Sequence, residues 1–292
     1  HLPALVHPEP RSVLIVGCGA GVTAGSFTRS PSIRRIVICE IEPMVPQRVT
    51  PYFRNENYDV LSDPRVEVVY DDARHYVLTT HEKFDIVTSD PIHPWVRGSG
   101  SLYSREYFRL VKRILNPGGV VSQWVPVYQA SEDAVKSEIA TFFSVFPNGT
   151  LWAGINKGTG FDMVMLGTDE PTTIDLGQLQ ERASRSEFTP VAQSLLGVGF
   201  RSPWELMASY LGRPADLADW TAGAVINRDM RPWLQYRAGW DSYSEQRHDL
   251  YQILARYRRF PSGLFLGPES LRQAVRDAGS APPPAPGPPT KP

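Results

Sequence analysis

The sequence predicts an α/β fold with a mostly parallel sheet, and two observations support this. From residue 11 to about residue 169, short β-branched runs alternate with helical patterns, which is typical of βαβ units. From about residue 170 the alternation stops and helical patterns dominate. We therefore expect a sheet-based region that is followed by a helical extension.

Seven strands are expected in the first region. Five have the buried character of parallel strands, at residues 12–16, 35–40, 66–70, 84–89 and 119–124. Two closing strands, joined by a glycine-rich turn, are expected at residues 150–153 and 162–167. The clearest helices are expected at residues 104–115 and 132–146. The segment Asn116-Pro117-Gly118-Gly119 should stop the first helix and turn into the next strand.

The expected domain division follows these patterns: a lead-in over residues 1–10, the sheet region over 11–169, a helical extension over 170–279 and a Pro-rich, disordered tail over 280–292. Within the extension, helices are expected at residues 174–184, 203–211 and 242–259. The extension carries Trp204, Trp220, Trp233 and Trp240. Two roles are open for it: a helical layer packed on the sheet, or a lid over the site.

Composition narrows the class of protein. The 292 residues are 41% hydrophobic and 21% charged, as in ordinary globular proteins. A formal net charge of -1 gives no electrostatic reason to expect nucleic acid or an anionic membrane as partner. We find no signal peptide and no run of about 18 apolar residues that could span a bilayer. Cys18 and Cys39 lie near the ends of predicted buried strands, so we expect reduced packing residues and a cytoplasmic location.

A glycine-rich turn follows the first strand. Gly17, Gly19 and Gly21 form a GxGxG pattern, and glycine there permits positive φ and close approach of a ligand. A tight βα turn without a ligand is the plainer interpretation. Glu40 ends the second strand, where a carboxylate can accept both ribose hydroxyls. Asp72, followed by Ala73, lies at the end of the third strand, where a carboxylate can accept an adenine amino group. Together these strand ends predict an adenosine pocket.

The glycine spacing indicates which nucleoside the pocket takes. Dinucleotide-binding proteins prefer GxGxxG, whereas this chain has GxGxG and no nearby basic residue to meet a phosphate. A cofactor without phosphate, such as S-adenosylmethionine or its decarboxylated form, fits better. No metal is expected.

A second candidate site follows the strand at residues 84–89. Asp90 lies at its carboxyl end, in a loop that Pro91 and Pro94 stiffen, and open α/β sheets place their chemistry at such positions. Asp90 is either a catalytic carboxylate or a cap for backbone N–H groups of the loop. His93 and Trp95 are candidate substrate-binding residues, since an indole can stack on an aliphatic amine. A packed loop aromatic is the alternative for Trp95.

Several motifs resemble those of the polyamine aminopropyltransferases, the spermidine synthase family. They occur in family order as VLIVGCGAGVTAG, IVICEIEP, VEVVYDDARHYV, FDIVTSDPIHPW, SLYSREYF and LNPGGVVSQW. The resemblance covers about residues 5–167. It is closest to a bacterial branch in which such a domain is fused behind membrane helices, and INRDMRPWLQY at residues 226–236 is similar to that branch.

The resemblance implies a methyltransferase-like, Rossmann-type sheet of seven strands. It implies transfer of an aminopropyl group from decarboxylated S-adenosylmethionine to an amine such as putrescine. In the family pattern, Glu40 matches the ribose-binding residue and Asp72 the adenine-binding residue. Asp90 lies five residues after Asp85 and matches the first Asp of the DxxDP loop, which is the general base.

The chain departs from the family pattern at three places. Ala20 stands where the family's glycine loop carries an Asp, and His93 stands where the DxxDP loop carries its second Asp. The family's N-terminal β-hairpin region is expected to be missing from this sequence, because His1 matches its last residue. The adenosine half of the pocket is therefore expected to be complete, whereas the amine half has lost carboxylates.

Other functions stay open beside aminopropyl transfer. An S-adenosylmethionine-dependent methyltransferase would use the same adenosine pocket. A non-catalytic nucleoside-binding domain of a membrane protein would keep that pocket without turnover, and an NAD-dependent dehydrogenase is a more distant alternative. The expected partner is a small-molecule amine. The resemblance leaves open a homodimer and an anchor of membrane helices in a full-length protein.

Overall fold

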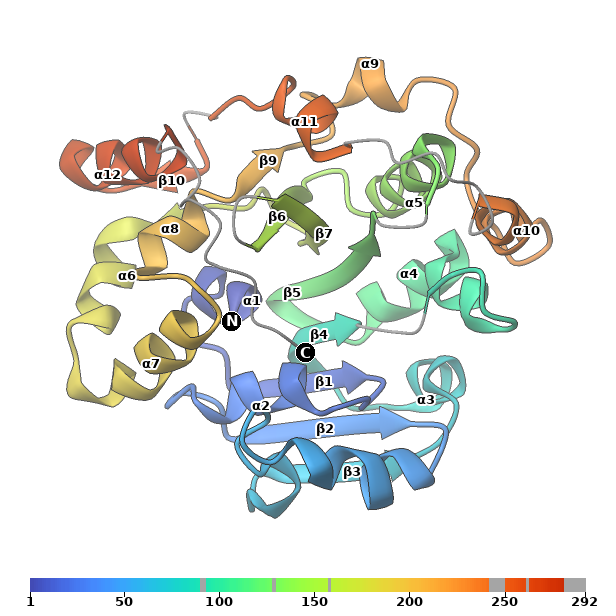
Figure 1. Ribbon diagram of the computed structural model, residues 1–292, viewed down its shortest axis with the longest axis horizontal. Helices are drawn as coiled ribbons and strands as arrows, with labels where there is room; N and C mark the ends of the chain where they lie inside the picture. The colour runs from blue at the N-terminus through green and yellow to red at the C-terminus, as the bar shows by residue number, and fades with distance from the viewer. Residues whose placement is uncertain (90–92, 128–129, 157–158, 242–249, 261–262, 281–292) are drawn as a thin grey trace, which may run out of the picture.

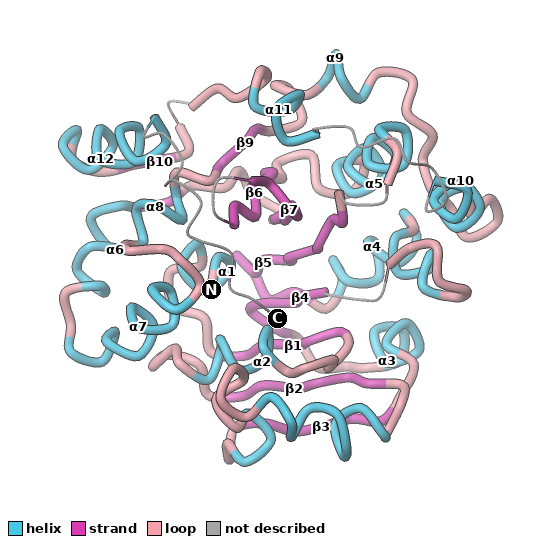
Figure 2. The backbone as a smooth tube through the Cα atoms, in the orientation of Figure 1, coloured by secondary structure: helices cyan, strands magenta, loops and turns pink. Residues whose placement is uncertain are grey.

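The computed structural model describes residues 1–89, 93–127, 130–156, 159–241, 250–260 and 263–280. Its centre is an eight-stranded sheet in the order β3-β2-β1-β4-β5-β7-β6-β9. Figure 1 shows this sheet running through the middle of the molecule, and Figure 2 shows helices on both of its sides. The predicted α/β class, with a methyltransferase-like and mostly parallel sheet, is confirmed.

Five strands form the parallel part of the sheet. They are β1 (Ser12–Val16), β2 (Arg35–Glu40), β3 (Val66–Tyr70), β4 (Phe84–Ser89) and β5 (Leu115–Pro126). β1, β2 and β4 are almost wholly buried, as continuous apolar runs in a parallel sheet should be. β3 is the edge strand; it exposes Glu67 and Tyr70, and its three valines are only half-buried.

The remaining strands run antiparallel and complete the sheet. β6 (Thr150–Asn156) pairs with β7 (Thr159–Gly167), and β7 pairs with β5. β9 (Tyr210–Gly212) comes from the C-terminal region and pairs with β6. Seven strands were expected from the first region, and this eighth strand corrects the helix expected at residues 203–211. That helix, α8 (Pro203–Met207), ends earlier because Tyr210 pairs with Trp152 in the sheet.

Helices of the first region connect these strands. They are α1 (Leu2–Val6), α2 (Val22–Thr28), α3 (Ala73–Thr79), α4 (Arg105–Arg113) and α5 (Glu132–Phe143), with short turns η1 (Val45–Val49), η2 (Thr50–Phe53), η3 (Val60–Ser62) and η4 (Ser99–Tyr103). Ser104 caps α4 by accepting from the Tyr107 amide, and Ser131 caps α5 in the same way. β5 begins at Leu115 and therefore includes the expected Asn-Pro-Gly-Gly turn. The pairing of β5 with β4 shifts register at this point, between Phe84 and Ile86.

The C-terminal region supplies the remaining elements. Its helices are α6 (Leu176–Ala183), α7 (Thr189–Gly197), α8, α9 (Ala218–Thr221), α10 (Trp233–Asp241), α11 (Leu250–Ala255) and α12 (Glu269–Ser280), with η5 (Ser186–Phe188) before α7. β8 (Ile174–Asp175) and β10 (Phe265–Leu266) form a small second sheet. The helix expected at 174–184 therefore begins only at Leu176. Of the helix expected at 242–259, residues 242–249 lie outside the described residues.

The C-terminal helices divide into two groups (Figure 1). α6, α7, α8 and α12 gather with α1 around an apolar core that includes Trp152, Tyr210 and Phe265. α9 and α10 pack on α5, and α10 also contacts η4. Among the described helices, none combines the length and hydropathy needed to cross a bilayer. The proposed boundaries between the regions stay a prediction.

Asp85 joins three strands at their amino-terminal edge. Its Oδ2 accepts from the Arg11 and Ser12 amides at 2.8 and 2.9 Å, and its Oδ1 accepts from the Asn116 side chain at 2.7 Å. Partial burial raises the pKa of Asp85, but these hydrogen bonds outweigh burial and the net pKa is lowered. Asp85 therefore stabilises the sheet at the edge opposite the predicted site.

Candidate functional site

The carboxyl ends of the parallel strands meet at one edge of the sheet. Val16 pairs with Cys39 on one side and with Ser89 on the other, and Ser89 pairs with Gln123. The glycine loop follows Val16, and Glu40 follows Cys39. The strands that lead to the glycine loop and to Glu40 therefore end beside the strand that ends at Ser89. Open α/β sheets bind ligands at this kind of edge.

The glycine loop has the backbone that the sequence predicted. Gly17, Gly19 and Gly21 have φ values of 88°, 52° and 79°. A Cβ atom at Gly21 would lie 2.7 Å from Cγ2 of Thr50, whereas a Cβ at Gly19 would meet nothing within 4 Å. Gly21 is therefore required for packing, and the open space at Gly19 leaves the backbone accessible to a ligand.

Glu40 crosses from β2 to the glycine loop. The side chain is only 8% exposed, and its Oε2 accepts from the Cys18 amide at 2.8 Å while Oε1 accepts from the Glu42 amide at 2.9 Å. Each oxygen keeps a second lone pair that a ligand hydroxyl could use. Ile41, which the sequence reasoning missed, follows directly and is 67% exposed. Ile41 could have been predicted from its position, because an apolar residue directly after an acidic strand end can pack against a purine base.

Asp72 and Ala73 begin α3. Asp72 is exposed, and its Oδ1 caps the helix by accepting from the amides of Arg74 at 2.7 Å and His75 at 3.2 Å. Ala73 is partly buried against the main core. The Asp71 amide donates to the Glu40 carbonyl at 3.2 Å, so this turn lies beside the end of β2. Contacts of Asp72 and Ala73 with a nucleoside stay a prediction.

Asp90 lies outside the described residues, as do Pro91 and Ile92. The strand that carries Asp90 ends at Ser89, between β1 and β5. Its role as general base stays a prediction.

His93 lies within an aromatic cluster. Its ring centroid is 4.3 Å from that of Trp95 and 5.1 Å from that of Trp124 on β5. Trp95 also packs against a small core that contains Tyr103 and Leu234. The structure thus places His93 and Trp95 in contact. It also places Trp124 beside His93, which the sequence did not predict because Trp124 belongs to a different segment, strand β5.

Three buried polar groups lie near this strand edge. The hydroxyls of Ser89 and Tyr107 lie close enough to interact with each other, and the amide oxygen of Gln123 has no hydrogen-bond partner among the described residues. Burial raises the pKa of Tyr107, which keeps its hydroxyl neutral. Buried polar groups are rarely left unpaired, so the Gln123 oxygen is suited to a polar ligand. Ser89 and Tyr107 lie within the motifs FDIVTSDPIHPW and SLYSREYF, but neither was predicted as a site residue.

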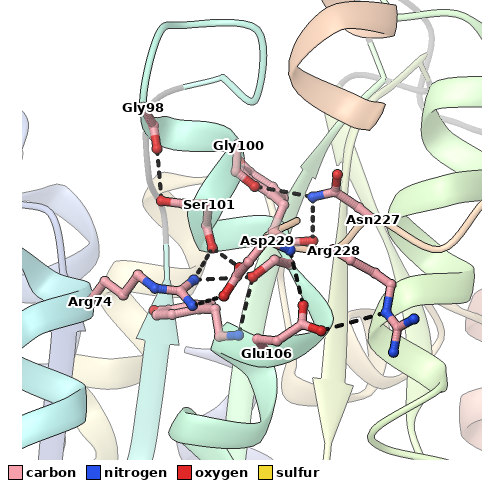
Figure 3. Close-up of polar contacts among 11 residues, drawn as sticks. Arg74, Gly98, Gly100, Ser101, Glu106, Asn227, Arg228 and Asp229 are labelled. Atoms are coloured by element: carbon pink, nitrogen blue, oxygen red, sulfur yellow. Dashed lines mark hydrogen bonds and ion pairs between the residues drawn. The ribbon is translucent and has the colours of Figure 1, made fainter. Parts of the chain in front are cut away.

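Arg74 extends from α3 to the loop that follows β4 (Figure 3). One guanidinium nitrogen donates to the Ser101 carbonyl at 2.8 Å and to the Ser104 hydroxyl at 3.1 Å. The other forms an ion pair with Asp229 in the C-terminal region. Arg74 therefore connects the turn at Asp72 with two segments that are distant in sequence.

Within the described ranges, no three His, Cys, Asp or Glu side chains gather in a group suited to a metal ion. The groups present are instead two carboxylates, open glycine backbone and an apolar side chain, a set that fits an uncharged nucleoside body.

Comparisons with known proteins identify relatives. A family model described as the spermine/spermidine synthase domain matches residues 1–151. A polyamine aminopropyltransferase of Aeropyrum pernix is 38% identical over 135 residues, which are 45% of this chain and 43% of that protein. One from Nitrosomonas europaea is 31% identical over 184 residues, which are 58% of this chain and 55% of that protein. The chain spans about half the length of the curated relatives that it matches.

Solved structures agree on the fold. A spermidine synthase from Thermotoga maritima has a TM-score of 0.58 at 19% identity, covering 75% of this chain and 71% of that one. A spermidine synthase in complex with the transition-state analogue AdoDATO has a TM-score of 0.52 at 16% identity, covering 88% of this chain and 71% of that one. Because the family model matches more than half of the 292 residues, the chain belongs to the spermine/spermidine synthase family.

Proposed function

We propose that this chain is a polyamine aminopropyltransferase that moves an aminopropyl group from decarboxylated S-adenosylmethionine to an amine. The observation that carries this proposal is that two sets of groups lie at one edge of the sheet, where the carboxyl ends of the parallel strands meet. There the open glycine loop and Glu40 share one sheet edge with the buried Ser89 hydroxyl and with the buried Gln123 side-chain oxygen, which has no partner among the described residues. A nucleoside and an amine could therefore lie side by side in the geometry that a displacement needs.

The adenosine part would be held by four features of the chain. Glu40 would accept the ribose hydroxyls, and Asp72 would accept the adenine amino group. Ile41 would cover one face of the purine, and Gly19 would allow the backbone to approach closely. The nucleoside supplies an aminopropyl carbon that is activated by its attachment to a sulfonium sulfur.

The amine must lose a proton as its nitrogen attacks that carbon. The new C–N bond forms as the C–S bond breaks, and the electron pair remains on sulfur. Asp90 would accept the amine proton, and the buried Gln123 oxygen could orient the amine N–H groups. On the acceptor side, the His93–Trp95–Trp124 cluster offers aromatic rings to the amine and its carbon chain.

Calorimetry and a transfer assay test this function together. We expect the wild-type chain to bind the decarboxylated nucleoside at least about tenfold more tightly than S-adenosylmethionine, and to form an aminopropylated amine. Asp90→Asn should keep the nucleoside affinity within about threefold and lower turnover by about 10²–10⁴-fold, the range for loss of a general base.

Each alternative has its own outcome. Methyl transfer from S-adenosylmethionine would replace the proposal with a methyltransferase. Nucleoside binding without turnover of any amine would indicate a non-catalytic binding domain. Full turnover by Asp90→Asn would remove Asp90 from its proposed role.

A further inference from the structure

A segment of the C-terminal region is bound across the loop that follows β4. We define residues 225–234 as the strap and residues 93–104 as the acceptor loop. The strap is anchored on α5, where Ser137 donates to the Val225 carbonyl at 2.5 Å and the Asn227 amide donates to Thr141 at 2.9 Å. The strap is therefore hydrogen-bonded to α5, which packs against β5 and β7 of the sheet.

Asn227 joins the strap to the end of the acceptor loop. Its side chain is fully buried and donates to the carbonyls of Gly100 and Tyr103, both at 3.1 Å. The backbone carbonyl of Asn227 accepts from the Arg105 amide at 3.0 Å, where α4 begins. Figure 3 shows Asn227 facing Gly100 in this network. A Cβ at Gly100 would lie 3.0 Å from Cβ of Gln235 on α10, so the acceptor loop also packs closely against the helix that follows the strap.

Charged groups extend these contacts toward residues 71–73, which carry the predicted adenine acceptor and which we call the nucleoside turn. The Asp229 amide donates to Glu106 at 3.1 Å, and Arg228 forms an ion pair with the same carboxylate. The Asp229 carboxylate pairs with Arg74, whose side chain also holds Ser101 and Ser104 of the acceptor loop. The Arg74 amide donates to Asp72, the predicted adenine acceptor. Arg74 thus contacts the acceptor loop and the strap (Figure 3), and its amide binds Asp72 in the nucleoside turn.

We propose that Arg74 is a positioning residue, held by Asp229 of the strap, that fixes the acceptor loop relative to the nucleoside turn. This inference rests on the proposed function, because the loop matters for catalysis only if an amine binds there. The three acceptors around Arg74 match the forked guanidinium, which a lysine ammonium cannot reproduce. Asp229 keeps the guanidinium in place, and the C-terminal region is then part of the catalytic unit.

Three variants of the full chain test this role. Asp229→Asn removes the charge and keeps the shape, Arg74→Met removes the guanidinium and keeps most of the methylene packing, and Asp219→Asn is an exposed acidic control on α9. We expect Asp229→Asn and Arg74→Met each to raise the KM for the amine by about tenfold, with nucleoside affinity changed less than twofold. The double variant should lose no more than either single variant, because both act on one contact.

Hydrogen exchange supplies a readout that needs no turnover. Amides of residues 98–106 should exchange faster in Asp229→Asn and Arg74→Met than in the wild type and in Asp219→Asn. Unchanged exchange there would overturn the inference even if the chain proves inactive. Faster exchange with an unchanged amine KM in an active enzyme would also overturn it, because the contact would then only stabilise the fold. Failure of the proposed function would appear separately, as absent transfer by the wild type.

Discussion

The Glu40 carboxylate accepts a 2.8 Å hydrogen bond from the amide of Cys18, which lies 22 residues earlier in the chain. This contact fixes the glycine loop against the end of β2, so one side chain both shapes the loop and presents oxygens toward the proposed ribose. The loop and the carboxylate therefore act as one unit.

Glu40→Gln should weaken nucleoside binding by about 10–100-fold, because the charged acceptor is lost and an amide NH₂ would face a backbone N–H group. Calorimetry with 5′-deoxy-5′-methylthioadenosine measures this directly. Glu42→Gln is the matched control, since Glu42 is an exposed carboxylate two residues away. Equal losses in both variants would remove Glu40 from the proposed pocket.

His93→Asp should lower the KM for a diamine by about tenfold, because a carboxylate attracts an ammonium and an imidazole carries no negative charge. Steady-state kinetics with putrescine and with a monoamine of equal length would show a gain for the diamine only. His93→Asn controls for the loss of the ring between Trp95 and Trp124. A gain of the same size in His93→Asn would show that space, not charge, limits the acceptor.

Glu138→Gln should make stability less dependent on pH. Glu138 is buried on α5, and neither carboxylate oxygen has a hydrogen-bond partner among the described residues. Burial raises the pKa of Glu138 well above its usual value of 4.5. The folded state then holds a proton that the unfolded state releases, so the contribution of Glu138 to stability is greatest below pH 4.5 and falls as pH rises toward the folded pKa.

The slope of that loss approaches about 1.4 kcal/mol per pH unit for one group. Urea unfolding at pH 5 and pH 8 should therefore show Glu138→Gln gaining on the wild type at the higher pH. Parallel pH profiles for the two proteins would mean that Glu138 is not held in its protonated form.

Asp85→Asn should lower the free energy of unfolding by about 1–3 kcal/mol, because a charged acceptor for the amides of Arg11 and Ser12 is lost. Nucleoside affinity should stay within about twofold, since Asp85 lies at the opposite edge of the sheet. Asp169→Asn, which removes an exposed ion pair with Lys112, should change stability by less than about 1 kcal/mol. A large loss of nucleoside affinity in folded Asp85→Asn would show that this residue also supports the site.

The sequence predicted the parallel strands well because each carries apolar, β-branched residues whose burial needs no distant partner to be recognised. The boundaries of β1, β2, β3 and β4 were all predicted correctly. Strand β9 was missed because its three residues follow a helical pattern and become a strand only through pairing with β6.

The sequence by itself determined the fold class, the glycine loop and the acidic strand ends, since local pattern and spacing place these at one edge of a parallel sheet. Only the tertiary structure decided which groups surround them. It placed Trp124 beside His93, left the Gln123 side-chain oxygen buried without a partner among the described residues, and joined Arg74 to Asp229, 155 residues away. Such contacts depend on how distant segments pack, and no local pattern in either segment encodes them.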